Sequence, residues 1–203
     1  MIVNRVLDHL FTSPAIIAVL RQLELRNAGI TGRNIARLSG ITHRSALKAL
    51  DNLETLKLVQ KQIAGKSYYF TLNRSHYLYK NVISQVFHAE RELKGKLTSK
   101  IKNSLGKLSE SILIFGSVAR NRETYKSDFD LCIIYSKNKG EIEKRLSSLR
   151  DNLYDEFGIS LAPFLITLTA FKSKSKNKKP PVNNIIKEGK VIAGKTIGEI
   201  ING

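Results

Sequence analysis

The sequence predicts a two-domain protein that combines α+β and α/β architecture, and three patterns along its 203 residues lead to this prediction. Residues 1–75 show three helical segments followed by a strand, a tight turn and a second strand. Residues 109–203 alternate strands and helices, which is typical of a small mixed sheet with helices, here expected on one side. Residues 76–108 are mostly helix-forming, so we expect a linker helix between the two domains.

Each helix expected in the first domain has a capping residue before its apolar positions. Glycine residues close the first two helices, and the run from Val59 to Leu72 is interrupted at Gly65, which predicts a hairpin. The expected N-caps are Ser13 (with Pro14 at the first helical position), Thr31 and Thr42.

Three helices with a glycine turn between the last two, followed by a hairpin, resemble a winged helix-turn-helix. The run Ile35-Ala-x-Leu-Ser-Gly-Ile-Thr42 is similar to bacterial and archaeal regulators of that type. The resemblance implies that the third helix enters the major groove of DNA. The expected DNA-binding residues on that helix and on the hairpin are Thr42, His43, Arg44, Ser45, Lys48, Lys61 and Lys66. A role in protein contacts or dimerisation stays open, because many winged helices serve one.

The net charge of +17 favours a polyanionic partner. Residues 1–80 carry 12 Lys and Arg against 4 Asp and Glu. Nucleic acid is a better candidate than a membrane surface, since no apolar membrane-binding face accompanies the charge. No apolar run is long enough to span a membrane, no secretory leader is evident, and the single cysteine Cys132 lies in an apolar run. We therefore expect a cytoplasmic protein without disulfides, although a basic surface can also serve solubility alone.

The second domain contains the chain's most informative motif. An apolar run ends in Gly116-Ser117, ten residues intervene, and Asp128-Phe-Asp130 opens a second apolar run. Strand periodicity places the two aspartates on one face and Phe129 on the other. Adjacent carboxylates are costly unless a cation lies between them, and Mg²⁺ prefers one or two carboxylates together with phosphate oxygens. The motif therefore predicts a site for magnesium and a nucleotide.

Gly-Ser, a ten-residue spacer and Asp-x-Asp resemble the signature of the DNA polymerase β-type nucleotidyltransferase superfamily, in particular its minimal prokaryotic members. The resemblance implies that a nucleoside triphosphate is bound and that its monophosphate is transferred to a hydroxyl of a protein or an RNA. Asp128 and Asp130 would be the catalytic metal ligands. The residues expected to bind the nucleotide are Gly116, Ser117, Arg120 and Lys126.

Two departures from the family pattern bear on activity. Active relatives carry a third carboxylate on a later strand, but the run from Ile159 to Ile166 contains no Asp or Glu, and Ser160 or Ala162 stands near the expected position. Asn121 also replaces a glycine that usually follows Ala-Arg. Two carboxylates are enough to bind a metal ion, but the group to which the resemblance assigns base catalysis is absent from this strand.

Two further segments leave alternatives open. Leu93, Leu97, Ile101 and Leu105 recur every four residues, which predicts either packing onto a domain or the seam of a homodimer. A hinge is expected within residues 102–107. The lysine-rich stretch 171–181 is expected to be a flexible loop that contacts nucleic acid or is simply solvated.

Three functions follow from these patterns. The first is an enzyme that transfers a nucleoside monophosphate. The second is a DNA-binding transcriptional regulator whose degenerate transferase domain senses a nucleotide. The third is an interaction module of the toxin–antitoxin type, which the paired aspartates disfavour because a pure scaffold does not need them.

Overall fold

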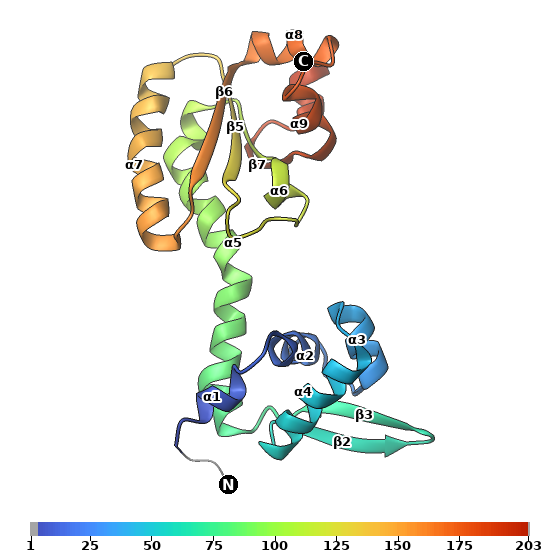
Figure 1. The fold of residues 1–203 in the computed structure, drawn as a ribbon. Helices are drawn as coiled ribbons and strands as arrows, with labels where there is room; N and C mark the ends of the chain where they lie inside the picture. The colour runs from blue at the N-terminus through green and yellow to red at the C-terminus, as the bar shows by residue number, and fades with distance from the viewer. Residues whose placement is uncertain (1–3, 203) are drawn as a thin grey trace. The chain divides into compact units, whose positions relative to one another are not determined.

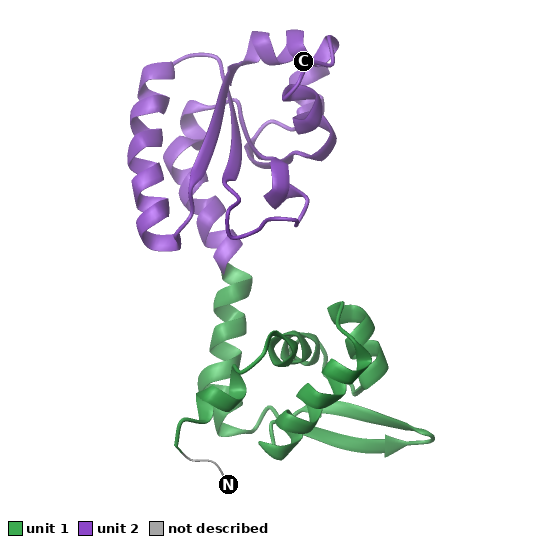
Figure 2. Cartoon of the chain, in the orientation of Figure 1, with its two compact units in different colours: residues 1–92 green, residues 93–203 purple. Residues whose placement is uncertain are grey.

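The computed structural model of the chain describes residues 4–202. It divides into two compact units, unit 1 up to Glu92 and unit 2 from Leu93 onwards (Figures 1 and 2). The boundary falls inside the long helix α5 (Ser84–Leu105). The architecture is mixed helix and sheet, as predicted.

Unit 1 has the fold of a winged helix-turn-helix. The short strand β1 pairs antiparallel with β3, which in turn pairs with β2, so that the hairpin forms the wing of a three-stranded sheet (Figure 1). The elements before α5 are α1 (Val6–Leu10), α2 (Pro14–Glu24), β1 (Ile30–Thr31), α3 (Gly32–Ser39), α4 (His43–Thr55), β2 (Val59–Ala64), β3 (Ser67–Leu72) and the π-helical turn η1 (Tyr79–Ile83).

The predicted caps form as expected. The hydroxyl oxygens of Ser13, Thr31 and Thr42 accept hydrogen bonds from the backbone N–H groups of Ile16, Asn34 and Ser45, at 3.4, 3.4 and 3.1 Å. Gly40 ends α3 with a φ of 65°, a left-handed conformation that glycine adopts without a Cβ clash. Each helix therefore begins or ends where the local chemistry of the sequence requires.

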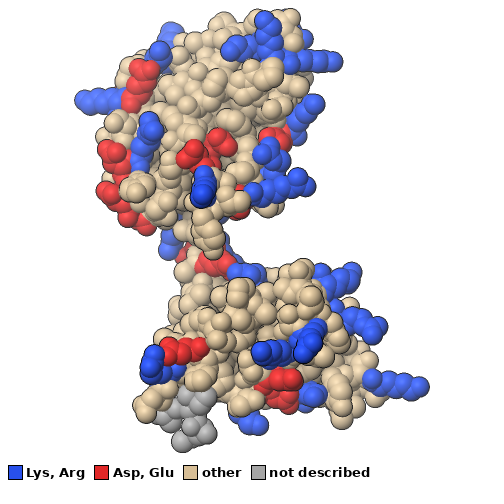
Figure 3. Space-filling view, viewed as in Figure 1, with Lys and Arg blue, Asp and Glu red and all other residues tan. Residues whose placement is uncertain are grey.

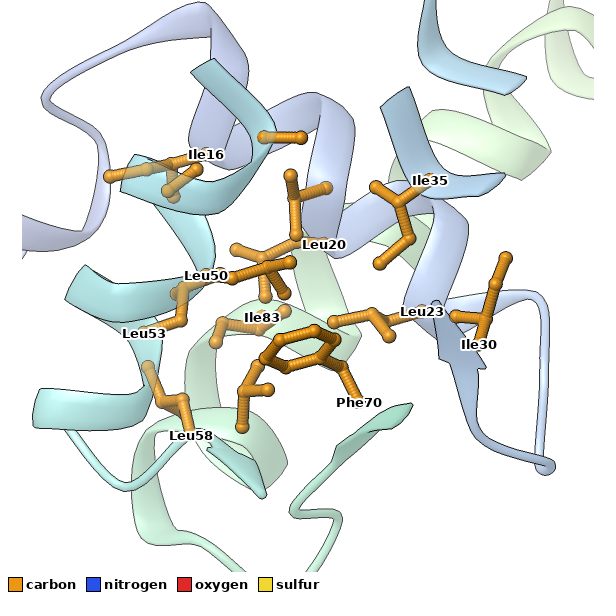
Figure 4. Packing of buried hydrophobic residues seen from close by; sticks show 14 of the residues in the cluster. Ile16, Leu20, Leu23, Ile30, Ile35, Leu50, Leu53, Leu58, Phe70 and Ile83 are labelled. Carbon is orange, nitrogen blue, oxygen red and sulfur yellow. The ribbon is translucent and has the colours of Figure 1, made fainter. Parts of the chain in front are cut away.

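The core of unit 1 joins all three predicted helices to the hairpin and to the start of α5. Figure 4 shows Leu20 and Leu23 of α2 facing Leu50 and Leu53 of α4, with Phe70 of β3 closing the layer. Leu25 lies just after α2 ends and is 64% exposed, so it does not belong to this core.

Unit 2 is built on a mixed four-stranded sheet in the order β6-β5-β4-β7. β5 and β6 are parallel, and β4 is antiparallel to both β5 and β7. After α5, its elements are the 3-10 turn η2 (Gly106–Leu108), β4 (Ser111–Ile114), α6 (Gly116–Ala119), β5 (Phe129–Tyr135), α7 (Lys139–Phe157), β6 (Leu161–Thr167), α8 (Leu168–Lys176), α9 (Val182–Glu188), β7 (Lys190–Gly194) and α10 (Ile197–Asn202).

Helices cover both faces of this sheet, so the expectation of helices on one side was wrong. Alternate residues of β5 enter different cores: Leu131 and Ile133 pack with α5 and α7, whereas Cys132 and Ile134 pack with α8, α9 and α10 (Figure 1). The strand is buried on both faces because its apolar run is continuous rather than alternating.

The apolar stripe of α5 belongs to the core of unit 2. Leu97, Ile101 and Leu105 are at most 3% exposed and pack in the cluster that contains α7, while Leu93 remains half exposed. Of the two alternatives for this stripe, packing within the chain is therefore the one observed. The expected hinge at residues 102–107 is also wrong, because α5 continues through Leu105 and η2 follows directly.

Pro163 lies within β6 without breaking it, because β6 is an edge strand where a missing backbone donor is tolerated. One further expectation for unit 2 needs correction. The lysine-rich stretch is not a loop throughout: α8 extends to Lys176 and is anchored by the buried Phe171.

None of the helices described between residues 4 and 202 has the length and apolar character of a membrane-spanning segment.

Candidate nucleotide site and nucleic-acid interface

The start of β5 carries the aspartate pair. Phe129 is buried against α5 and α7, which places Asp128 and Asp130 towards the other face of the sheet. Asp130 is half-buried and its backbone oxygen accepts a hydrogen bond from the N–H of Phe115 at 3.1 Å, whereas Asp128 is exposed. The pair thus lies beside the end of β4, where α6 begins.

Gly116 and Asp130 are packed so closely that only glycine fits. Gly116 has a φ of 69°, and a Cβ built on it would lie 2.8 Å from Cγ of Asp130. The motif's glycine therefore serves two purposes: it makes the left-handed turn into α6, and it leaves room for the carboxylate. This contact joins the Gly-Ser half of the motif to the Asp-x-Asp half.

The environment of Asp130 disfavours its ionised form. Burial raises the pKa of Asp130 first, and the charges of Asp128 and Glu188 raise it further, while Arg120 opposes them. A carboxyl group held in this way gains from a nearby cation, because the cation compensates for both the lost solvation and the repulsion. The oxygen donors of the pair fit Mg²⁺, which completes its coordination with water and phosphate.

Arg120, expected to contact the nucleotide, is held by a residue that the sequence analysis did not consider. Its Nη1 donates a hydrogen bond to Oε1 of Glu188 at 2.6 Å, across 68 residues of sequence. Glu188 ends α9, which contacts α6. The positive charge beside the aspartate pair is therefore partly neutralised within the chain.

The remaining motif residues lie on or next to α6. Ser117 is in its first turn, and Lys126 is exposed in the following loop, with no carboxylate of residues 4–202 within ion-pair distance of its ammonium group. Asn121 has a φ of 53°. Asn tolerates this left-handed conformation better than most residues, so it can stand where relatives have glycine without losing the turn.

No carboxylate occupies the position of the third acid. Ala162 of β6 is the direct neighbour of Asp130 on β5, and the carbonyl of Ser160 accepts a hydrogen bond from the N–H of Phe129 at 2.8 Å. Within residues 4–202, no group of three His, Cys, Asp or Glu side chains is arranged to hold a metal ion. The strands β5 and β6 thus bring only the carboxylates of the two aspartates to this site, within residues 4–202.

A groove of about 540 Å³ separates α4 from the hairpin in unit 1. His43, Lys61 and Lys66, all expected to contact DNA, line it together with Arg33 of α3. The ammonium group of Lys61 lies 4.2 Å from the ring centre of Tyr68 on the neighbouring strand. This cation–π contact holds one of the hairpin's lysines above the groove.

The other face of α4 borders a second groove of about 590 Å³, formed with the α1–α2 segment. Ser45 and Lys48 line it, together with His9 and Ser13. Thr42 and Ser45 also engage each other, because their hydroxyl oxygens lie 2.8 Å apart in the N-cap. The seven expected DNA-binding residues therefore do not form one cluster but extend over α4 from one groove to the other.

The basic residues of unit 1 divide into two groups. Arg21 pairs with Glu90 at 2.6 Å, while Arg74 and Arg91 both pair with Glu24. In contrast, no carboxylate of residues 4–202 lies within ion-pair distance of Lys61, which contacts the Tyr68 ring, or of five further basic residues on α3, α4 and the hairpin: Arg33, Arg37, Arg44, Lys48 and Lys66. Figure 3 shows Lys and Arg side chains gathered over this part of unit 1. We call these five residues the winged-helix basic surface.

Sequence reasoning missed two groups in these sites. Arg33 follows the Thr31 cap of α3, and its place at the start of a helix next to the hairpin was a usable signal. Glu188 is the only acidic residue between Glu156 and Glu199, but nothing local indicated that it would meet Arg120.

Comparison with known proteins agrees with the fold of unit 2. Residues 99–197 match the family model described as polymerase beta, nucleotidyltransferase. The matched segment contains all four strands of the sheet in unit 2, so the match supports a nucleotidyltransferase fold for this part of the chain. None of the curated proteins compared with the chain matches it.

Several solved structures are similar to parts of the chain. One is the transcriptional regulator PA3341, with 23% identity, a TM-score of 0.35, and 44% of this chain and 69% of that one covered. A mutant of the toxin–antitoxin pair MntA–HpeT has 11% identity and a TM-score of 0.37, over 53% of this chain and 80% of that one. TrmBL2, an archaeal chromatin protein, has 15% identity and a TM-score of 0.30, over 90% and 73%. Likenesses at this level do not extend to function.

Proposed function

We propose that the chain is a DNA-binding protein whose nucleotidyltransferase domain binds a magnesium–nucleoside triphosphate complex as an effector. The observation that carries this proposal is the aspartate pair beside Gly116, with Ala162 where a third carboxylate would stand. Two carboxylates are enough to hold Mg²⁺ on a triphosphate, because phosphate oxygens supply further ligands. Without a third one, nothing on β6 can take the proton from an attacking hydroxyl.

Each residue of the pocket has a distinct part in this proposal. Asp128 and Asp130 would hold the metal, which when bound neutralises phosphate charge. Gly116 keeps the space beside Asp130 open, and Ser117 and Lys126 lie where they can contact phosphate oxygens. Arg120 is available to the nucleotide only to the extent that Glu188 releases it.

Nucleotide binding is tested by titrating the full chain with labelled ATP, GTP, CTP and UTP, with and without Mg²⁺. Asp128→Asn/Asp130→Asn should abolish the magnesium-dependent part of binding. The matched control is Asp151→Asn/Asp155→Asn, which removes two exposed carboxylates of α7. Equal binding by the site variant and the control would refute the pocket.

DNA binding is proposed for the winged-helix basic surface. Its five cations have no competing acidic partner within residues 4–202, so they remain available to phosphates and to guanine edges. Arg44→Ala/Lys48→Ala should weaken binding to duplex DNA and make the salt dependence shallower by about 0.9 for each phosphate that is no longer neutralised. Lys80→Ala/Lys94→Ala removes the same charge outside the surface, and an equal effect of that control would remove α4 from the interface.

Transfer of a nucleoside monophosphate to a protein or RNA hydroxyl is the second candidate. The intact aspartate pair next to Gly116 favours this candidate, because nucleotidyl transfer would need the same two residues that nucleotide binding needs. Label that passes from the nucleotide to an acceptor only with Mg²⁺, and not in Asp128→Asn/Asp130→Asn, would establish the enzyme. Nucleotide-sensitive DNA binding without any label transfer would support the regulator.

A further inference from the structure

Unit 2 carries a second basic surface, separate from the winged helix. From Phe157 to Lys187 the chain contains no Asp or Glu, and Glu188, which follows, is held by Arg120. Six lysines of this region, and Lys190 just after it, lie within ion-pair distance of no carboxylate of residues 4–202; the six are Lys172, Lys174, Lys176, Lys178, Lys179 and Lys187. We call these seven residues the α8–α9 lysine surface.

Five of these lysines lie on α8, α9 or β7, and Lys178 and Lys179 lie in the short segment that joins α8 to α9. Phe171 of α8 and Ile185 of α9 are fully buried in the core that covers one face of the sheet. Thr167 caps α8 by accepting a hydrogen bond from the N–H of Ala170 at 3.2 Å. Figure 3 shows Lys and Arg side chains along the edge of unit 2 where Figure 1 places α8. The charges are thus held in place by packing.

The opposite side of the sheet is electrostatically different. On α7, Lys139 pairs with Glu143, and Arg145 donates to Glu141 at 2.7 Å. Lys100 of α5 pairs with Glu156. The helix α7 carries four Lys and Arg together with five Asp and Glu, whereas residues 168–190 carry seven Lys and a single acidic residue, Glu188. The α8–α9 side therefore has an excess of positive charge, which attracts polyanions.

We propose that the α8–α9 lysine surface binds the phosphate backbone of a nucleic acid, in addition to the contact proposed for the winged helix. Lysine suits this task because it is a point charge that neutralises phosphate without reading sequence. Between Leu168 and Lys190 no large apolar side chain is exposed, so the surface lacks the anchors by which amphipathic helices enter a membrane. Ser173, Asn177 and Asn184 lie among the lysines and offer further hydrogen bonds.

This inference goes beyond the proposed function, because it needs neither a nucleotide in the pocket nor DNA on α4. It predicts that the lysines of unit 2 steepen the dependence of nucleic-acid affinity on salt concentration, in addition to the effect of the winged helix. For duplex DNA, that share is about 0.9 in the slope of log K against log salt for each phosphate neutralised.

The test measures binding of a fluorescent DNA duplex and a single-stranded RNA to the full chain by anisotropy, between about 50 and 200 mM salt, the range in which phosphate contacts dominate. The variant changes Lys174, Lys176, Lys179 and Lys187 to Gln. The charge-matched control changes Lys102, Lys137, Lys144 and Arg150 to Gln, which are basic residues outside α8 and α9 that also lack ion-pair partners within residues 4–202. Circular dichroism checks that both variants are folded.

With at least one of the two ligands, we expect the variant's slope to be shallower by about 2 to 4 and the control's slope to stay near that of the parent chain. The same reduction should appear when Arg44→Ala/Lys48→Ala is already present, which separates this surface from the winged helix. An unchanged slope with both ligands, or an equal reduction in the control, would overturn the proposal. So would a variant that loses binding to anionic lipid vesicles while it keeps nucleic-acid binding.

Discussion

At the scale of single residues, the candidate nucleotide site depends on two contacts between groups distant in sequence. Asp130 lies against Gly116, and Arg120 is paired with Glu188. The first contact explains why both halves of the motif are needed, since any side chain at position 116 would collide with the carboxylate. The second contact brings the negative charge of Glu188 beside Arg120, where the motif alone indicates only a positive charge.

Replacing Asp128 with Asn should lower the pKa of Asp130, because the Asp128 charge is one of the causes that raise it. Since the pKa of Asp130 is raised in the folded state, stability falls as the pH rises from the ordinary carboxyl pKa through the raised one, and Asp128→Asn should reduce this fall. Carboxyl chemical shifts followed by NMR against pH measure the change. A pKa of Asp130 that does not move would show that burial alone accounts for its shift.

Replacing Glu188 with Gln should release Arg120 towards the aspartate pair. We expect nucleotide binding about two- to fivefold tighter, which corresponds to the roughly 1 kcal/mol that a partly exposed ion pair is worth. Calorimetric titration of Mg²⁺–nucleotide into the parent chain and the variant measures this.

The matched control for that variant is Glu110→Gln, which breaks the comparable pair of Glu110 with Lys195 (2.7 Å) outside the site. Adding Arg120→Ala to Glu188→Gln should cancel the gain. If the gain persists without Arg120, removal of the Glu188 charge acts directly on the pocket and the release of Arg120 does not explain it.

At the scale of elements, the start of α4 is set by a local capping residue, whereas the order of α8 depends on packing against the sheet. The N-cap of α4 follows from Thr42 in the sequence, and the structure forms it as expected. Residues 171–181, which include most of α8, were predicted to be a flexible loop because lysines dominate their composition. A single buried aromatic residue, Phe171, together with the Thr167 cap, is enough to order it as a helix on the sheet.

Replacing Thr42 with Ala should destabilise unit 1 by about 1 kcal/mol, since the N–H of Ser45 loses its partner. Because the same turn carries Arg44, fraying there should also weaken DNA binding. Thermal unfolding and anisotropy measure the two effects.

Ser13→Ala removes the comparable cap of α2 and serves as the control for the Thr42 variant. We expect it to lower stability by a similar amount with a smaller effect on DNA. Equal losses of DNA binding in both variants would mean that the order of the α4 turn does not matter to the interface.

At the scale of the whole molecule, the two units have separate cores joined by one helix. Leu97, Ile101 and Leu105 of α5 belong to the core of unit 2, while Phe87 of the same helix belongs to that of unit 1. The segment expected to be a linker is thus shared between the two cores and is not a spacer.

The thiol of Cys132 should report the integrity of unit 2. It is completely buried in β5, and burial raises its pKa to about 12. We expect no reaction with a thiol reagent at about pH 8 in the native chain and full reaction in denaturant, because thiolate is the reactive form. Rapid labelling of the native chain would contradict the continuous packing of the sheet.

The features that could be predicted from the sequence are those that depend on residues close together in the chain. Caps, the glycine turns, the period of apolar residues in the helices and the i, i+2 placement of the aspartates all involve residues a few positions apart. For this reason the order of elements, the winged-helix pattern and the Asp-x-Asp pair could be predicted, along with the burial of Phe129 and Cys132.

Contacts between residues far apart in the chain could not be predicted in this way and are known only from the folded structure. The pairing of Arg120 with Glu188, the burial of the α5 stripe in unit 2 and the division of the sheet into two covered faces all join segments far apart in the chain. The spacing of residues in the sequence predicts that one face of a helix or strand is apolar or charged. It does not predict which element covers that face, because this depends on the packing of the whole unit. The charged neighbours of the aspartate pair are a further example. The structure places both Arg120 and Glu188 beside Asp130, although they are far apart in the sequence.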